Sequence, residues 1–285
     1  MQSHPYFDLK LHDDEELEAL IGDQIAERVT LHEWPLSCVQ RLTLAQGRKL
    51  IYKSQYGPTV EAEVYERARS PLLPWAKTLY RAEGHVCALI EYVDAPMLED
   101  LEPSAEEALR VAREVRAQMD GLGDDLPCYI DVRNAERWQD YTQAMLGELG
   151  ALIDGGAFTE TTAERAEQLA DRAASPAVRA AFDRRCGYVH RDFSADNVLV
   201  LPDGYRIIDW QRPIYGPTEL DQVDLLNSLG YDPAQYVDGG VVQVWLILSI
   251  GWLTEAKARW FPQGDSYDRQ VAELIARLCA LAGPG

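Results

Sequence analysis

The sequence predicts an α+β protein in which a small mixed lobe is followed by a larger, mainly helical lobe. Helix and strand patterns alternate over the first part of the chain, separated by turns that contain glycine. After Asp94-Ala95-Pro96 helical patterns dominate, and only two short strand patterns return among them. We therefore place the boundary there, with one lobe at residues 1–94 and the other at residues 95–285.

The predicted elements of the first lobe are helix, hairpin, helix and hairpin. Apolar residues on one face predict an amphipathic helix over 13–27. A hairpin over 37–53 turns at Ala45-Gln46-Gly47-Arg48, and a helix over 59–69 stops at Ser70-Pro71. Strands over 76–81 and 86–93 complete the lobe.

The second lobe opens with a helix over 104–119, whose start carries the capping box Ser104 to Glu107. The apolar run 241–253 contains polar residues and is too short for a membrane span, so we expect a buried helix. Further helices are predicted over 138–152, over 162–174 and from 220 onward, and strands over 198–201 and 205–208.

Composition excludes some classes of function. The 285 residues carry a formal charge of −20, whereas nucleic-acid binding requires a basic face. The five cysteines are scattered, which disfavours a disulfide framework or a zinc ribbon. No secretory signal pattern opens the chain. We expect a cytoplasmic protein that binds neither nucleic acid nor membrane.

One motif carries chemistry: His190-Arg191-Asp192 with Asn197 five residues after the aspartate. It fits the H-R-D-x-x-x-x-N loop of phosphoryl-transfer sites, and a strand-turn-strand then leads to Asp209. Such a site needs a carboxylate beside the acceptor hydroxyl, a role that Asp192 fills. It also needs oxygen ligands for Mg²⁺, which Asp209 and the neutral amide of Asn197 supply.

The chain resembles the aminoglycoside phosphotransferase and choline kinase superfamily, which shares the protein-kinase fold. The resemblance rests on 189–199, on Ile207-Ile208-Asp209-Trp210 and on Thr218-Glu219-Leu220-Asp221. It implies a bilobal kinase-like fold and a bracing role for Asp221 behind the catalytic loop. It also implies that Lys53 contacts the nucleotide phosphates.

In kinases a helical glutamate pairs with that lysine. Glu61, Glu63 and Glu66 compete for the role, and Glu61 is favoured because it shares a face with apolar residues. The stretch 89–93 resembles the hinge strand, so backbone groups at Glu91 and Val93 are expected to bind adenine. These four residues, Lys53, Glu61, Glu91 and Val93, form the predicted nucleotide site.

Three departures from the kinase pattern matter. No G-x-G-x-x-G precedes Lys53, and only Gly47 lies in the hairpin turn. Gly216-Pro217 follows Asp209 within eight residues, which leaves no room for a phosphorylatable activation loop and favours a small acceptor over a protein. The resembled small-molecule enzymes more often have glycine at the position of Arg191, and the sequence assigns this arginine no role.

The resemblance thus implies a Mg²⁺-dependent kinase that transfers the γ-phosphoryl of ATP, or of GTP, to a hydroxyl of an aminoglycoside-, other antibiotic-, choline- or sugar-like molecule. The alternatives are a nucleotide-binding pseudokinase scaffold and a protein kinase. One helix face carries three tryptophans, Trp245, Trp252 and Trp260. This spacing fits either an aromatic site for a quaternary ammonium group or a helix face packed in the core. Three carboxylates could contact amines of an acceptor or could simply be exposed to solvent: Glu219, Asp224 and Glu255.

Overall fold

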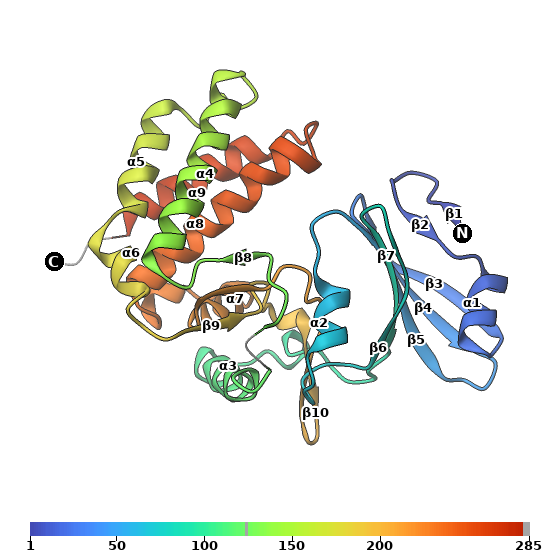
Figure 1. The fold of residues 1–285 in the computed structure, drawn as a ribbon. Coiled ribbons are helices and arrows are strands. Elements are labelled where there is room, and N and C mark those ends of the chain that lie inside the picture. The colour runs from blue at the N-terminus through green and yellow to red at the C-terminus, as the bar shows by residue number, and fades with distance from the viewer. Residues whose placement is uncertain (123–124, 282–285) are drawn as a thin grey trace. The chain divides into compact units, whose positions relative to one another are not determined.

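The computed structural model describes residues 1–122 and 125–281. By their contacts the residues form two compact units (Figure 1). Unit 1 comprises Met1–Tyr129 and Asp192–Pro213, and unit 2 comprises Ile130–Arg191 and Ile214–Gly285. These units do not coincide with the division at residues 94 and 95, because unit 1 also takes in two segments of the expected helical lobe. That division into lobes stays a prediction.

Unit 1 is built on a five-stranded antiparallel sheet with the order β3-β4-β5-β7-β6. The predicted hairpins are confirmed, but the sheet also has a strand that the sequence patterns did not reveal. Its strands are β3 (Ile25–Trp34), β4 (Ser37–Leu44), β5 (Lys49–Tyr56), β6 (Ala76–Ala82) and β7 (His85–Glu91).

The predicted helix over 13–27 is wrong at its C-terminal end. Helix α1 covers Asp14–Ile21, begins with a capping box between Asp13 and Glu16, and stops at Gly22. Gly22 has φ of 78°, a left-handed conformation that suits glycine and ends a helix. Ile25, expected on the helix face, instead starts strand β3.

The two faces of the sheet have different partners. Leu50 and Tyr52 of β5 pack with Leu17 of α1 in a hydrophobic core, and Figure 1 shows α1 against these strands. Side chains alternate along a strand, so Lys53 points to the opposite face. The short strands β1 (Gln2–Ser3) and β2 (Lys10–Leu11) precede α1.

On the face of Lys53, unit 1 places Glu61 and Asp209 against the sheet. The rest of the unit contains α2 (Glu61–Arg67), η1 (Glu99–Leu101) and α3 (Ala105–Met119), the last with the expected capping box. The segment 192–213 adds η2 (Ala195–Asn197) and the predicted hairpin of β10 (Val198–Leu201) and β11 (Gly204–Ile207). Backbone bonds hold this hairpin in place: Leu98 donates to Val198, and Ile207 donates to Leu72.

Unit 2 is mainly helical. The long helices α4, α5, α8 and α9 pack on one another, as Figure 1 shows. Its helical elements are α4 (Ala135–Asp154), α5 (Ala163–Ala173), α6 (Pro176–Ala181), α7 (Leu220–Ser228), η3 (Pro233–Gln235), α8 (Gly239–Glu255), η4 (Ala256–Trp260) and α9 (Tyr267–Ala280). A three-stranded sheet, missed in the sequence, has the order β8 (Ile130–Asp131), β12 (Ile214–Pro217), β9 (Cys186–Val189).

Helix α8 is the buried helix that the apolar run 241–253 predicts. Gly239–Trp260 is long and apolar enough to cross a membrane by length and composition. However, 72% of its most apolar window is buried inside the protein, which is typical of a core helix. A sheet-rich N-terminal part and a helical C-terminal part confirm the predicted α+β class.

Candidate active site

A buried lysine lies at the centre of the site in unit 1. Lys53 Nζ lies 2.7 Å from Oε2 of Glu61 and also donates to Oδ1 of Asp209. Glu61 is therefore the glutamate that reaches the lysine, as its helix face predicts. Glu63 and Glu66 instead lie near Arg81, at 3.7 and 3.1 Å.

Burial makes this pairing strong. Lys53 is 6% exposed and Glu61 2% exposed. Burial alone would lower the pKa of Lys53, but the carboxylates of Asp209 and Glu61 outweigh it and raise that pKa above its ordinary value. Burial raises the pKa of Glu61, which Lys53 opposes. Tyr65, one turn along α2, donates its hydroxyl to Glu61 at 3.2 Å.

The loop from Asp192 to Asn197 is closed by hydrogen bonds of its own. Asn197 is buried, and its Nδ2 donates to the carbonyl of Asp192 at 2.9 Å and to Oγ of Ser194 at 3.1 Å. Phe193 is fully buried and anchors the loop, whereas Asp192 is exposed. The loop therefore presents the Asp192 carboxylate at the surface of unit 1.

The turn after β11 holds Asp209. Its φ is 66°, a backbone strain that proteins tend to keep at functional sites. Trp210 is fully buried and donates Nε1 to the carbonyl of Ile207 at 2.9 Å. Gln211, which stands where the kinase motif D-F-G has its glycine, donates Nε2 to Asp209 at 2.6 Å, and its carbonyl accepts from Val60 beside α2. The sequence did not single out Gln211 as a partner of Asp209.

Loop and turn are tied together, because the N–H of Ile208 donates to the carbonyl of Asn197 at 3.1 Å. This bond brings Asn197 close to Asp209, the residue that follows Ile208. The sequence predicts both as metal ligands. The amide nitrogen of Asn197 makes the two loop bonds, so its side-chain oxygen is the atom offered to an ion. With the Asp209 carboxylate this is an all-oxygen donor set, which fits Mg²⁺.

Asp221 and Arg191 belong to unit 2. The carboxylate of Asp221, 4% exposed, accepts the backbone N–H of His190 at 3.0 Å and of Arg191 at 3.4 Å. It therefore holds the start of the catalytic motif, as the resemblance implies. Arg191 has φ of 69°, which accounts for the glycine that the resembled enzymes more often have here.

Glu91 and Val93 lie at and beyond the end of β7, and their part in adenine binding stays a prediction. Glu91 pairs with Leu50, its N–H donates to Trp75, and its carboxylate accepts from the N–H of Trp75 at 3.0 Å. The carbonyl of Val93 accepts from Ala95 at 3.1 Å.

The hairpin turn at Gly47 is not the one that adjoins Lys53. In the sheet, Thr43 pairs with Lys49 at that end, whereas Ser37 pairs with Gln55 two residues beyond Lys53. The turn between β3 and β4, at Pro35-Leu36, is therefore the nearer one, and Leu36 accepts the N–H of Tyr56 at 2.9 Å. The sequence did not reveal it, because the predicted helix over 13–27 took in the first residues of β3 and the rest of that strand carried no assignment.

The acidic residues considered for an acceptor, and Trp245 among the tryptophans, have partners within unit 2. Glu219 accepts from Arg184 at 2.5 and 2.8 Å, Asp224 from Arg191 at 3.0 Å, and Glu255 from Arg259 at 3.4 Å. Trp245 is 8% exposed, and the guanidinium groups of Arg191 and Arg277 each lie 5.7 Å from its ring centre. Its surroundings are those of a core residue.

The model of the phosphotransferase enzyme family matches residues 60–259, well over half of the chain. The protein belongs to this family. The predicted superfamily and the predicted enzyme class, phosphotransferase, are thereby confirmed. No curated protein matches the chain significantly.

Solved structures of the superfamily share the fold at low identity. A choline/ethanolamine kinase family protein from Mesorhizobium loti is 18% identical with a TM-score of 0.57, over 90% of this chain and 88% of that one. Macrolide 2'-phosphotransferase MphH from Brachybacterium faecium is 14% identical with a TM-score of 0.57, over 94% of this chain and 97% of that one. Amicoumacin kinase hAmiN, in complex with AMP-PNP, Ca²⁺ and Ami, is 11% identical with a TM-score of 0.56, over 94% of this chain and 93% of that one.

Proposed function

We propose that this phosphotransferase moves the γ-phosphoryl group of ATP to a hydroxyl of a small molecule. The observation that carries the proposal is the convergence of Lys53, Glu61 and Asp209 in unit 1, through contacts that span up to 156 residues of chain. The loop of Asp192 and Asn197 is bonded to the same turn. The nucleotide complex of amicoumacin kinase supports a nucleotide as the donor.

Each residue has a distinct role in this reaction. The Asp192 carboxylate, exposed on its loop, accepts the proton of the acceptor hydroxyl and orients the oxygen for attack. The ammonium group of Lys53 contacts the phosphates, and Glu61 holds that group in place. Asn197 and Asp209 would hold Mg²⁺, which supplies charge neutralisation of the phosphates when bound. Backbone groups at Glu91 and Val93 are proposed to bind the base.

A small acceptor is favoured over a protein. Only residues 210–219 separate Asp209 from helix α7, and part of this segment is strand β12. A phosphorylatable activation loop does not fit into so short a connection. We therefore propose an antibiotic-, choline- or sugar-like alcohol as the acceptor, in the cytoplasm.

The test is a panel of aminoglycosides, macrolides, amino alcohols and sugars, incubated with the protein, Mg²⁺ and ATP or GTP. Phosphorus NMR of the products then shows whether a phosphate ester forms. The proposal predicts a new ester with at least one acceptor and none without Mg²⁺. Tight nucleotide binding that needs no metal, with no ester from any acceptor, would instead identify a scaffold.

A further inference from the structure

We propose that Arg191 is a positioning residue for phosphoryl transfer, held by Asp224 as a built-in counter-ion. Its side chain fixes the backbone from which the next residue, Asp192, projects. This inference rests on the proposed function, since that function gives Asp192 its role.

The backbone of Arg191 needs support. Its φ of 69° lies in the left-handed region, where a side chain is strained and glycine is not. Among the described residues, the non-glycine residues with positive φ are Glu83, Glu102, Arg191 and Asp209. Two of these four belong to the chemical motif, Arg191 directly before Asp192 and Asp209 itself. An arginine persists at such a position only when its surroundings compensate for the strain.

The contacts of the guanidinium supply that compensation. Nη1 donates to Oδ1 of Asp224 on α7 at 3.0 Å. Nη2 donates to Oγ of Ser249 at 2.9 Å and to the carbonyl of Trp245 at 3.3 Å, both on α8. The side chain thus joins the loop to two helices, while Asp221 holds the backbone N–H of the same residue at 3.4 Å.

The counter-ion is as firmly held as the arginine. The side chain of Asp224 is 9% exposed and that of Arg191 15% exposed. Oδ1 of Asp224 also accepts from Nε1 of Trp245 at 2.5 Å. Because the carboxylate is part of helix α7, the charge of Arg191 is balanced without any added phosphate or other anion. The side chain of Arg191 is therefore held by residues of the fold alone.

The chain offers a matched control in Arg277 of α9. Its guanidinium lies at the same 5.7 Å from the ring centre of Trp245 as that of Arg191. It donates to Asn227 at 3.4 Å, not to the loop. A general effect of a cation on Trp245 would appear in an Arg277 variant, whereas an effect on the loop would not.

The test compares Arg191→Gly, Arg191→Lys, Asp224→Asn and Arg277→Gln in the full chain. The probe is MgATP alone, with ADP release into water measured for kcat and nucleotide titration for the dissociation constant. Arg191→Gly removes the strain and the contacts together, and Asp224→Asn keeps the shape of the counter-ion without its charge. We expect kcat to fall about 10- to 100-fold in both, since a small displacement of a catalytic group has effects of this order.

The MgATP dissociation constant is expected to stay unchanged in these variants, because Lys53 and Asp209 are untouched. Arg191→Lys should recover part of kcat, and Arg277→Gln should match the wild type. Wild-type kcat in Arg191→Gly and Asp224→Asn would overturn the inference, as would an equal loss of nucleotide affinity. A wild-type protein that neither releases ADP from MgATP nor forms a phosphate ester with any acceptor of the panel would instead overturn the proposed function.

Discussion

At the scale of single residues, Lys53 shows how burial turns an ordinary charge into part of a site. An exposed lysine would gain little from a nearby carboxylate. With Lys53 and Glu61 almost fully buried, each needs the other, because an uncompensated buried charge is very costly. The pair therefore serves both stability and phosphate binding, and the two contributions can be separated.

Lys53→Met is expected to lower the free energy of unfolding by about 3–5 kcal/mol, because it leaves Glu61 buried without its partner. The double variant Lys53→Met/Glu61→Gln should recover most of this loss and none of the phosphoryl transfer. Urea unfolding and ATP turnover of the two variants check the prediction.

Arg81→Gln is the control, since Arg81 forms an exposed pair with Glu66 and should cost less than about 1 kcal/mol. A double variant as unstable as Lys53→Met would show that the loss does not come from the unpaired glutamate.

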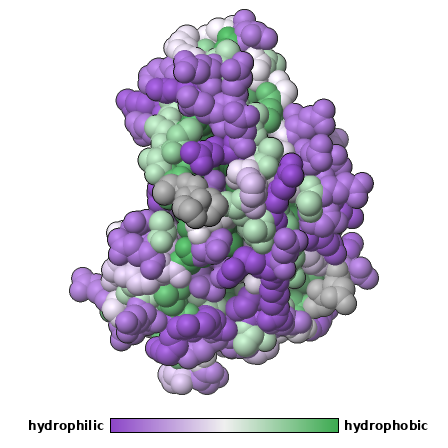
Figure 2. Space-filling view, turned by 90° about the vertical axis from the view of Figure 1, so that its left-hand side faces the viewer, coloured by the Kyte–Doolittle hydropathy of each residue, from purple (hydrophilic) through white to green (hydrophobic). Residues whose placement is uncertain are grey.

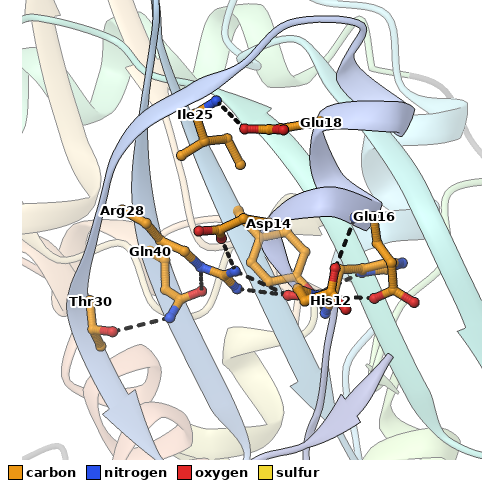
Figure 3. A network of polar contacts seen from close by, with 10 residues as sticks. His12, Asp14, Glu16, Glu18, Ile25, Arg28, Thr30 and Gln40 are labelled. Atoms are coloured by element: carbon orange, nitrogen blue, oxygen red, sulfur yellow. Dashed lines mark hydrogen bonds and ion pairs between the residues drawn. The ribbon is translucent and has the colours of Figure 1, made fainter.

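His12 is a second residue whose burial has a measurable consequence, and Figure 3 shows the network around it. Its ring is 5% exposed, and Nδ1 lies 3.0 Å from the hydroxyl of Tyr52. The N–H of His12 donates to the same hydroxyl oxygen. Arg28 donates to the His12 carbonyl at 3.0 and 3.1 Å.

Burial lowers the pKa of His12 and outweighs the carboxylate of Glu16, which raises it. A folded-state pKa below the ordinary value of about 6.5 means that the unfolded chain binds the proton more tightly. The contribution of neutral His12 to stability is thus present above about pH 6.5 and is lost as the pH falls below it. Thermal unfolding at pH 7.5 and at pH 5.5 should show this loss.

In His12→Asn the loss should be smaller, while in His32→Asn, a change at an exposed position on β3, it should equal that of the wild type. Identical pH dependence in the wild type and His12→Asn would contradict this account.

At the scale of elements, the sequence patterns predicted the turns and helix caps, which depend on a few neighbouring residues. The hairpin of β4 and β5, the capping box of α3 and the β10–β11 hairpin were all found, since turn and cap residues act over a few positions. Strand β3 was missed because Ile25 continues the apolar spacing of α1 beyond Gly22. The pairing of β3 with β4 is a tertiary interaction, which the hydrophobic periodicity of a single segment does not predict.

The site follows the same rule. Asp192, Asn197 and Asp209 were predicted because they form a motif with fixed spacing, and Glu61 because it shares an apolar helix face. The partners of Arg191 were not predictable, since Asp224 and Ser249 lie 33 and 58 residues further along the chain. The bond from Tyr65 to Glu61 has a helical spacing of four residues, so it could have been proposed from the sequence.

Between α5 and α9, one carboxylate connects two elements. Asp268, in the first turn of α9, accepts the backbone N–H groups of Thr159, Glu160 and Thr161 at 2.6, 2.7 and 2.8 Å. Burial alone would raise the pKa of Asp268, but these bonds lower it. The segment that leads into α5 is thereby fixed to α9.

Asp268→Asn is expected to lower the free energy of unfolding by about 1.5–3 kcal/mol, the range for hydrogen bonds to a charged group. Asp265→Asn, a change at an exposed position three residues earlier, should leave it unchanged. Urea unfolding at neutral pH provides the comparison, and equal midpoints for the two variants would refute the role of Asp268.

At the scale of the whole molecule, the proposed chemical residues gather in unit 1 although up to 156 residues of chain separate them. The sheet and α2 supply Lys53 and Glu61, and the segment 192–213 supplies Asp192, Asn197 and Asp209. Unit 2 supplies Asp221 and Asp224, which hold the chain just before Asp192. The motif thus lies where the chain passes from one unit to the other.

The surface agrees with a strongly acidic composition. Hydrophilic residues cover most of the face in Figure 2, with hydrophobic residues in smaller areas between them. The formal charge of −20 gives the molecule a field that attracts cations and repels polyanions.

We propose above all that Asp192 accepts the proton of the acceptor hydroxyl during phosphoryl transfer, and that other residues of unit 1 bind the nucleotide and the metal at the same site. The most direct measurement compares Asp192→Asn with the wild type in MgATP binding and in product formation. We predict unchanged MgATP affinity, because Lys53, Asn197 and Asp209 remain, and a rate lowered at least about 100-fold, the scale of general-base catalysis. Transfer at the wild-type rate in Asp192→Asn would contradict the claim.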